Sequence, residues 1–176
     1  MRYLQDGSHQ SQPLMRLSLA LTLVLLLGFW ATNFAMYFSR MGLAPASVVA
    51  YYNGSEAEYR SPRSAASMLE TAHAHLPMMA MVMLLLTHLI IYVPLPRGAK
   101  AAFIAASFAF AALDEGGGWL VRFGSPSLAW VKVAGFLGLQ ACLGVLLALL
   151  AVSLARARRP SANGVPAASP SRAEAA

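Results

Sequence analysis

Two short groups of ionisable side chains stand beside apolar stretches of the sequence. ETAHAH contains Glu70, His73 and His75, and LDEGGG contains Asp114 and Glu115. Ionisable groups at membrane depth are costly and often mark functional sites. Imidazole and carboxylate groups together suit a divalent transition metal such as zinc, iron or copper, and they also suit a proton relay or a quinone-like ligand. All five residues are therefore candidate metal ligands.

Spacing limits which of these groups can act together on one helix. Glu70 and His73 are three residues apart and share a helical face, whereas His73 and His75 do not. Pro77 disfavours helical geometry at the preceding residue, so the sequence predicts a break near the histidines. Extended backbone there would let both imidazoles face the same way.

A structural role is the alternative for the same residues. Asp114 could form a buried ion pair with Arg122 or cap backbone groups freed at GGG, and interfacial histidines often cap helices. Such roles would hold the helices together without binding anything.

His88 lies deeper in the same apolar stretch and raises the possibility of b-type haem, with His73, His75 and His88 as candidate cofactor ligands. His75 and His88 differ by about 220° around a helix, whereas His73 and His88 differ by about 60°. No other apolar stretch contains a histidine, so a haem would need an axial ligand such as Met36 or a second subunit. An interhelical hydrogen bond, for example to Gln140, is the structural alternative.

The methionine-rich run LPMMAMVM resembles a copper motif, but its four methionines cannot all point one way on a helix. Flexible packing explains them better. The sequence has no phosphate-binding loop, nucleophile elbow, zinc-protease motif or cysteine pair. An enzymatic role is therefore not favoured.

Composition places the chain in a membrane. It is 58% hydrophobic and 11% charged, against about 25% charged residues in soluble domains. The excess apolar surface must face lipid, which makes the bilayer the first expected partner. The net charge of +6 comes from basic residues at the ends of apolar runs, so it indicates topology rather than nucleic-acid binding.

Four apolar runs have about the length that crosses a hydrocarbon core, and helices satisfy their own backbone hydrogen bonds in lipid. The sequence therefore predicts an all-α integral membrane protein, a four-helix up-down bundle. The expected spans are about 14–38, 76–93, 101–121 and 128–154.

Polar segments separate and flank these spans. Ser61 and Pro62 resemble the N-cap and first residue of a helix, and a short amphipathic helix is expected over about 63–74 before the second span. The remaining expectations are a cytoplasmic polar N-terminus at 1–13, an outer loop at 39–75 and a disordered cytoplasmic tail at 155–176.

The distribution of Lys and Arg predicts the orientation. Eight basic residues lie on the side that holds both termini and the PRGAK turn, and five lie on the other side. We therefore expect both termini in the cytoplasm of a bacterium, with the protein in its inner membrane. The short turn makes the second and third spans antiparallel neighbours, which would bring ETAHAH and LDEGGG to similar depth on the outer side.

Small residues repeat in the last two spans. Gly135, Gly138, Ala141 and Gly144 follow one another at three-residue spacing. Small residues let helix backbones approach closely in a membrane, where no hydrophobic effect drives helix association. The repeat predicts close helix packing.

The strings GLAPASVVAYYNGSEAEY, LETAHAHLPMM, LTHLIIYVPL and LDEGGGWLVRFGSPSLAW resemble a family of small bacterial inner-membrane proteins without an assigned function. Its members look like four-helix proteins with an H-x-H-L sequence opening the second helix. The resemblance covers about residues 14–154 and implies the same topology, with His73, His75, His88 and Asp114 as candidate residues.

These observations favour an accessory or electron-transfer component of the inner membrane that binds a metal or redox cofactor at an outward-facing His/carboxylate site. Its partners could include a redox or other membrane complex, or a second copy in a homodimer. The alternatives are a non-catalytic subunit or scaffold, and a small transporter or proton-conducting protein with a polar path between Asp114 and His88.

Overall fold

The computed structural model describes residues 13–91 and 95–156. In chain order its helices are α1 (Pro13–Arg40), α2 (Pro45–Asn53), α3 (Ala65–Ile90), α4 (Arg97–Trp119), a π-helical turn η3 (Leu120–Gly124), a 3₁₀ turn η4 (Pro126–Leu128) and α5 (Ala129–Arg156). This confirms the all-α prediction for the described part. The predicted N-terminal segment 1–13 and tail 155–176 lie almost wholly outside it.

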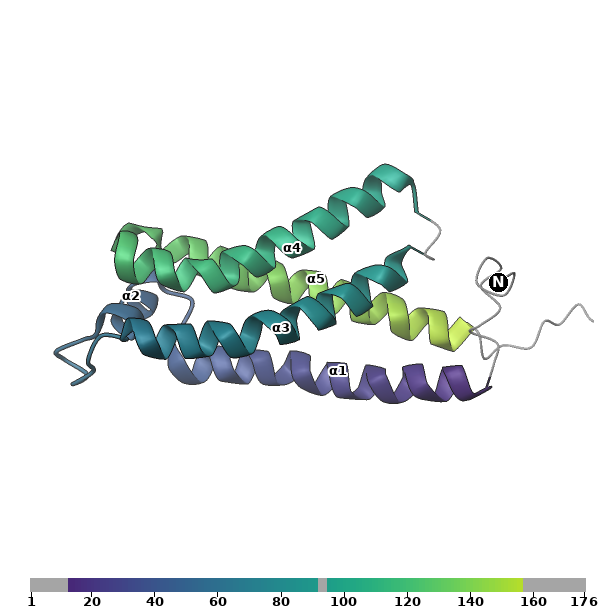
Figure 1. Cartoon of the computed structure of the whole chain (residues 1–176), viewed down its shortest axis with the longest axis horizontal. Coiled ribbons are helices and arrows are strands. Elements are labelled where there is room, and N and C mark those ends of the chain that lie inside the picture. Colours follow the sequence, from purple (N-terminus) through teal and green to yellow (C-terminus); the bar gives the residue numbers. More distant parts are fainter. Residues whose placement is uncertain (1–12, 92–94, 157–176) are drawn as a thin grey trace, which may run out of the picture.

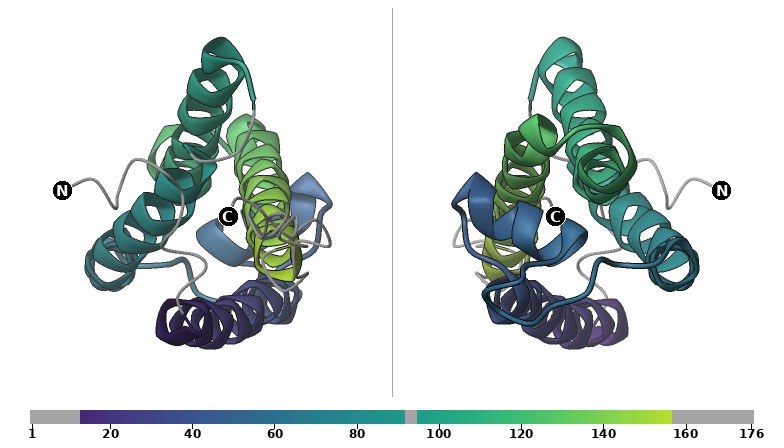
Figure 2. Two further views of the ribbon diagram at one scale, coloured as in Figure 1. Left: turned by 90° about the vertical axis from the view of Figure 1, so that its right-hand side faces the viewer. Right: turned by 90° about the vertical axis from the view of Figure 1, so that its left-hand side faces the viewer.

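Four long helices form the body of the molecule. Figure 1 shows α1, α3, α4 and α5 running alternately in opposite directions along the long axis, with α2 at one end. The start of α1, the end of α3, the start of α4 and the end of α5 all lie at the opposite end. Seen end on, α1 and the start of α4 lie at opposite edges (Figure 2).

Within the described ranges, three helical stretches are long and apolar enough to cross a membrane: Pro13–Arg40, Ala65–His88 and Pro126–Ala155. α4 is 23 residues long, but it is rich in small residues and has charged residues near both ends, which makes it less apolar. The four-span bundle therefore stays a prediction.

The segment before the second span is more helical than expected. Part of the predicted outer loop 39–75 forms α2, and the short helix predicted at 63–74 is continuous with the span in α3. The Oγ of Ser64, rather than Ser61, accepts a hydrogen bond from the backbone N of Ser67 at 3.2 Å. α3 accordingly begins at Ala65.

The break predicted near Pro77 does not occur, because α3 continues through it. Membrane helices tolerate proline when their neighbours supply compensating contacts. The buried face of α3 continues on both sides of this residue, with Met68 and Ala72 before it and Met83 and Leu86 after it. Packing against the other helices therefore keeps the helix continuous.

Glycines set the close approach of α4 and α5. A Cβ on Gly135 would lie 2.5 Å from the backbone N of Asp114, and one on Gly117 would lie 2.8 Å from the Cα of Lys132. A Cβ on Gly138 would overlap the ring of Phe110. The predicted close packing of small residues is thus confirmed for this helix pair. We call this contact the α4–α5 seam.

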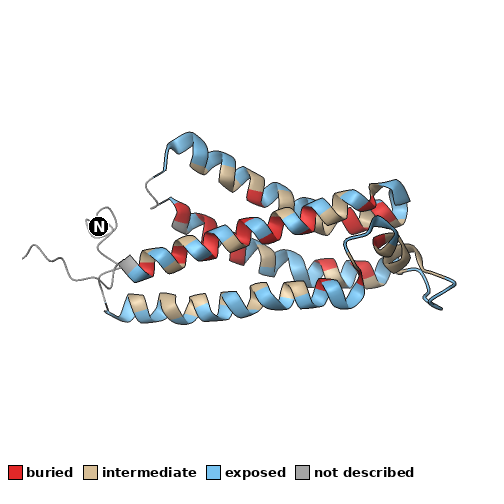
Figure 3. Cartoon of the chain, turned by 180° about the vertical axis from the view of Figure 1, so that it is seen from behind, coloured by how far each residue is buried: buried red, intermediate tan, exposed pale blue. Residues whose placement is uncertain are grey.

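Two apolar clusters fill the bundle. The larger joins α3, α4 and α5 around Met83, Leu86 and Leu143, and the smaller surrounds Val48 and Phe136 near α2. Figure 3 shows that buried positions concentrate on α5, while α1 is mainly exposed or intermediate. α5 is therefore the central helix.

Candidate functional site

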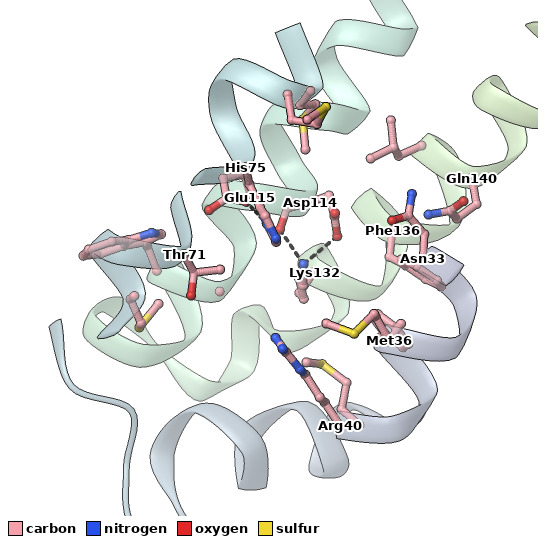
Figure 4. A pocket seen from close by; sticks show the side chains of 18 of the residues that line it. Asn33, Met36, Arg40, Thr71, His75, Asp114, Glu115, Lys132, Phe136 and Gln140 are labelled. Carbon is pink, nitrogen blue, oxygen red and sulfur yellow. Dashed lines mark hydrogen bonds and ion pairs between the residues drawn. The ribbon is translucent and has the colours of Figure 1, made fainter. Parts of the chain in front are cut away.

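A cavity of about 210 Å³ lies inside the α2 end of the molecule (Figure 4). Residues from α1, α2, α3, α4 and α5 all line it. Its polar lining residues are Asn33, Arg40, Tyr51, Tyr52, Arg63, Thr71, His75, Asp114, Glu115, Lys132 and Gln140. Its other lining residues are Phe29, Met36, Tyr37, Met41, Met68, Met78, Met79, Val82, Met83, Gly118, Trp119, Phe136, Leu139 and Leu143.

The lining changes from polar to apolar along the helix axes. On α5, Lys132 lies at the α2 end, and Leu143 is eleven residues further along, about 16 Å of helix rise. On α3, His75 precedes Met83 in the same direction. One end of the cavity is therefore rich in ionisable groups, and the other is enclosed by apolar side chains.

Lys132 and Asp114 form an ion pair across the α4–α5 seam. The Nζ of Lys132 lies 2.6 Å from Oδ1 of Asp114 and donates a second hydrogen bond, of 2.7 Å, to the backbone O of the same residue. The two side chains are only 11% and 16% exposed. Close approach at Gly117 and Gly135 makes this geometry possible. The alternative pairing of Asp114 with Arg122 was wrong, because Arg122 donates to the backbone O of Arg63 at 2.8 Å.

A second pair joins α3 to α4. Nδ1 of His75 lies 3.4 Å from Oε2 of Glu115, and the histidine side chain is 54% exposed while the carboxylate is 16% exposed. Figure 4 shows this pair beside the Lys132–Asp114 pair. Both carboxylates of LDEGGG thus have basic partners from different helices.

Two amide side chains line the middle of the cavity, Asn33 on α1 and Gln140 on α5. Gln140 is 3% exposed, and its backbone O accepts a 3.0 Å hydrogen bond from Nε1 of Trp30. Its side-chain Oε1 has no hydrogen-bond partner among the described residues. This side chain therefore lines the cavity with a buried acceptor that the described chain leaves unpaired.

α2 and the segment that follows it close the polar end. The backbone N of Arg63 donates to the O of Tyr52 at 3.0 Å, and Nδ2 of Asn53 donates to the O of Val121 at 3.3 Å. Burial raises the pKa of the Tyr52 hydroxyl, and electrostatic interactions with neighbouring Tyr51 and with the carboxylates of Asp114 and Glu115 act in the same direction. The hydroxyl is therefore a neutral group that can donate a hydrogen bond.

The predicted site residues divide into two groups. His75, Asp114 and Glu115 line the cavity, whereas Glu70, His73 and His88 are exposed and lie outside its lining. Within residues 13–91 and 95–156, no three His, Cys, Asp or Glu side chains form a group that could hold a metal ion. The structure thus supports the meeting of ETAHAH and LDEGGG but gives no support to the predicted metal ligand set.

Sequence reasoning missed Lys132 and most of the methionine lining. The lysine signal was visible, since Lys132 is the only charged residue within span 128–154, and such a residue requires a partner. The methionines come from separate segments, so only the fold reveals their convergence.

Comparison with known proteins supports the membrane assignment. Residues 42–161 match the model of a transmembrane helical domain, Aq_1264_TM. No curated protein and no solved structure matches the chain. The match begins after α1, so four of the five helices lie in the matching region, while α1 supplies a further wall of the cavity.

Proposed function

We propose that this chain, which belongs to the Aq_1264_TM family of transmembrane helical domains, is an accessory membrane protein that binds one amphipathic, lipid-soluble molecule in its cavity. The role is binding rather than catalysis. The observation that carries it is a cavity with the Lys132–Asp114 ion pair and the His75–Glu115 pair at one end and apolar side chains at the other.

The change from polar to apolar lining along the cavity matches a molecule with a hydrogen-bonding head and an apolar body. Ligand sites are commonly apolar cavities with a few convergent polar groups. Here His75, Tyr52 and Asn33 supply polar groups, while Val82 and Leu143 enclose the apolar end. A head seated at the polar end would place its apolar part among these side chains.

Entry from the bilayer explains how such a molecule would reach the cavity. α1 packs on α5 and makes little direct contact with α3, yet α1 and α3 both line the cavity. We propose that lipid-soluble molecules enter between these two helices.

We also propose that α4 is the fourth membrane span and that both termini lie in the cytoplasm of a bacterium. The Lys132–Asp114 pair offsets one charge of α4. The two basic residues of α4, Arg97 and Lys100, lie in the first turn of the helix. Reporter fusions should place the PRGAK turn and both termini on one side of the inner membrane. A turn found outside the cell would overturn this orientation.

Matched tryptophan variants test the proposed binding role. Met79 lines the cavity, whereas Met81, on the same helix, is 69% exposed. Mass spectrometry of solvent extracts should find a lipid-soluble compound, near one per chain, with the purified wild type and Met81→Trp. Met79→Trp fills the cavity and should lose it. Equal retention by both variants, or no such compound in any sample, would contradict the proposal.

A scaffold role is the second candidate, because the Lys132–Asp114 and His75–Glu115 pairs each join two helices. It predicts that no compound depends on Met79. A polar path toward His88 has less support, because Met83 and Leu143, which line the apolar end of the cavity, belong to the larger apolar cluster. An absorption spectrum and metal analysis of the same sample test the haem and metal alternatives. A Soret band would support haem, and one metal ion per chain would support a metal site.

A further inference from the structure

Methionine side chains converge on the cavity. Six of the nine methionines in the chain line it, and they come from α1, from the segment after it and from α3. They are Met36, Met41, Met68, Met78, Met79 and Met83. Thioether sulfurs make favourable contacts with the edges of aromatic rings, and flexible methionines adapt to a flat ligand. This lining suits a planar conjugated ring.

The unpartnered Oε1 of Gln140 marks a place where a polar ligand atom would be favourable. The side chain is 3% exposed and lines the cavity, eight residues beyond Lys132 on α5, about 12 Å of helix rise. A ligand with a hydrogen-bonding atom well inside the cavity would therefore complement this amide. An amide can donate N–H to a carbonyl or accept from a hydroxyl, so it can recognise both forms of a group that alternates between C=O and C–OH.

An acyl chain does not provide such an atom. A fatty acid or phospholipid would place its carboxylate or phosphate near Arg40 and Arg63 and its hydrocarbon beside Gln140. The buried amide would then stay without a partner, which is unfavourable. The charges of Asp114 and Lys132 already satisfy each other, so this pair does not require a charged head group.

We infer that the ligand is of the quinone/quinol class, with its ring among the methionines and one ring oxygen on the amide of Gln140. This inference rests on the proposed binding role and specifies the ligand chemistry for the same cavity. Both the quinone and the quinol would bind, because recognition depends on the ring and its two oxygens.

Titration of the full-length protein with a benzoquinone carrying a ten-carbon tail tests the inference. The protein is held in phosphatidylcholine nanodiscs, and tryptophan fluorescence is followed because Trp119 lines the cavity. Saturable quenching is expected. Gln140→Leu should raise the apparent Kd at least tenfold, and its fold should survive because Trp30 bonds to the main chain of residue 140. Asn33→Leu, on α1, is the second variant if Gln140→Leu does not fold. Leu137→Met, at an exposed position of α5, is the control and should bind as the wild type does.

Three outcomes overturn the inference and separate it from the proposed function. Equal quinone affinity in the wild type and the Leu variants would remove the role of the amides. Saturable binding of oleate, lost in Met79→Trp, without quinone binding would leave the binding role in place with a different ligand. If neither probe binds saturably, the proposed function fails together with this inference.

Discussion

The contact of α5 with α4 and the contact of α5 with α1 form two walls that are built differently. Against α4, glycine brings the backbones together, so that a Cβ on Gly135 would meet the backbone of Asp114 at 2.5 Å. Against α1, large aromatic side chains keep the helices apart, and Tyr37 stacks on Phe136 with ring centroids 3.8 Å apart. The first wall is a backbone contact, and the second depends on side-chain packing.

This difference matches the division of roles around the cavity. The α4–α5 seam fixes Asp114 and Lys132, which need accurate geometry because buried charges are costly when unpaired. α1 contributes Asn33 and Met36, and only Tyr37 is buried on that helix. In the proposed function, the seam therefore provides a fixed polar wall, and α1 provides the wall at which a ligand would enter.

Breaking the Lys132–Asp114 pair should have the largest effect. Lys132→Met leaves the Asp114 carboxylate buried without its partner, and such losses cost about 3–5 kcal/mol. The unfolding midpoint in an SDS titration should fall strongly. The double variant with Asp114→Asn should recover part of the loss, since it removes the unpaired charge. A single variant as stable as the wild type would show that the pair is not a structural element of the seam.

The same glycine substitution on the two walls should give different results. Gly135→Ala places a Cβ against backbone that cannot easily move, and overpacking of this kind costs about 1–3 kcal/mol. Gly28→Ala on α1 meets no atom within 4 Å, so its effect should stay within about 0.5 kcal/mol. Paired SDS titrations measure both. Similar losses at the two positions would argue against a special role for the seam.

Loosening α1 should have a smaller and more local effect. Trp30→Phe removes the hydrogen bond to the backbone O of Gln140, and interhelical hydrogen bonds in membranes contribute about 0.6 kcal/mol on average. Limited proteolysis in detergent should cut near α1 faster, while the global unfolding midpoint changes little. Thr32→Val is the control, because that hydroxyl bonds within its own helix. Equal cleavage rates for Trp30→Phe and the control would mean that this bond does not hold α1.

The long helices could be predicted from the sequence because apolar length and small-residue spacing are local signals. The glycine repeat containing Gly135 and Gly138 correctly indicated close packing. The sequence analysis did not predict α2, because this helix has only nine residues and is followed by a polar segment. The effect of Pro77 was overestimated. The backbone preference of the residue before a proline does not include the tertiary contacts that hold α3 before and after Pro77.

The candidate site was only partly predictable, because it depends on helix rotation and register. Antiparallel pairing correctly brought His75 to Glu115, but it could not say that Glu70 and His73 would face away from the cavity. Arg122 lies eight residues after Asp114 on a nearly continuous helical run, about 12 Å of rise. That separation argues against the proposed pairing, whereas Lys132 approaches from the neighbouring helix.

Hydrogen–deuterium exchange in detergent tests the fixed and adjustable walls most directly. The purified protein is measured before and after a lipid-absorbing resin has removed the bound compound. No organic solvent is used. We expect residues 29–40 of α1 to lose protection after removal, while residues 132–143 of α5 keep theirs. Unchanged exchange on α1, or equal loss on both helices, would contradict a cavity closed by an adjustable helix against a fixed seam.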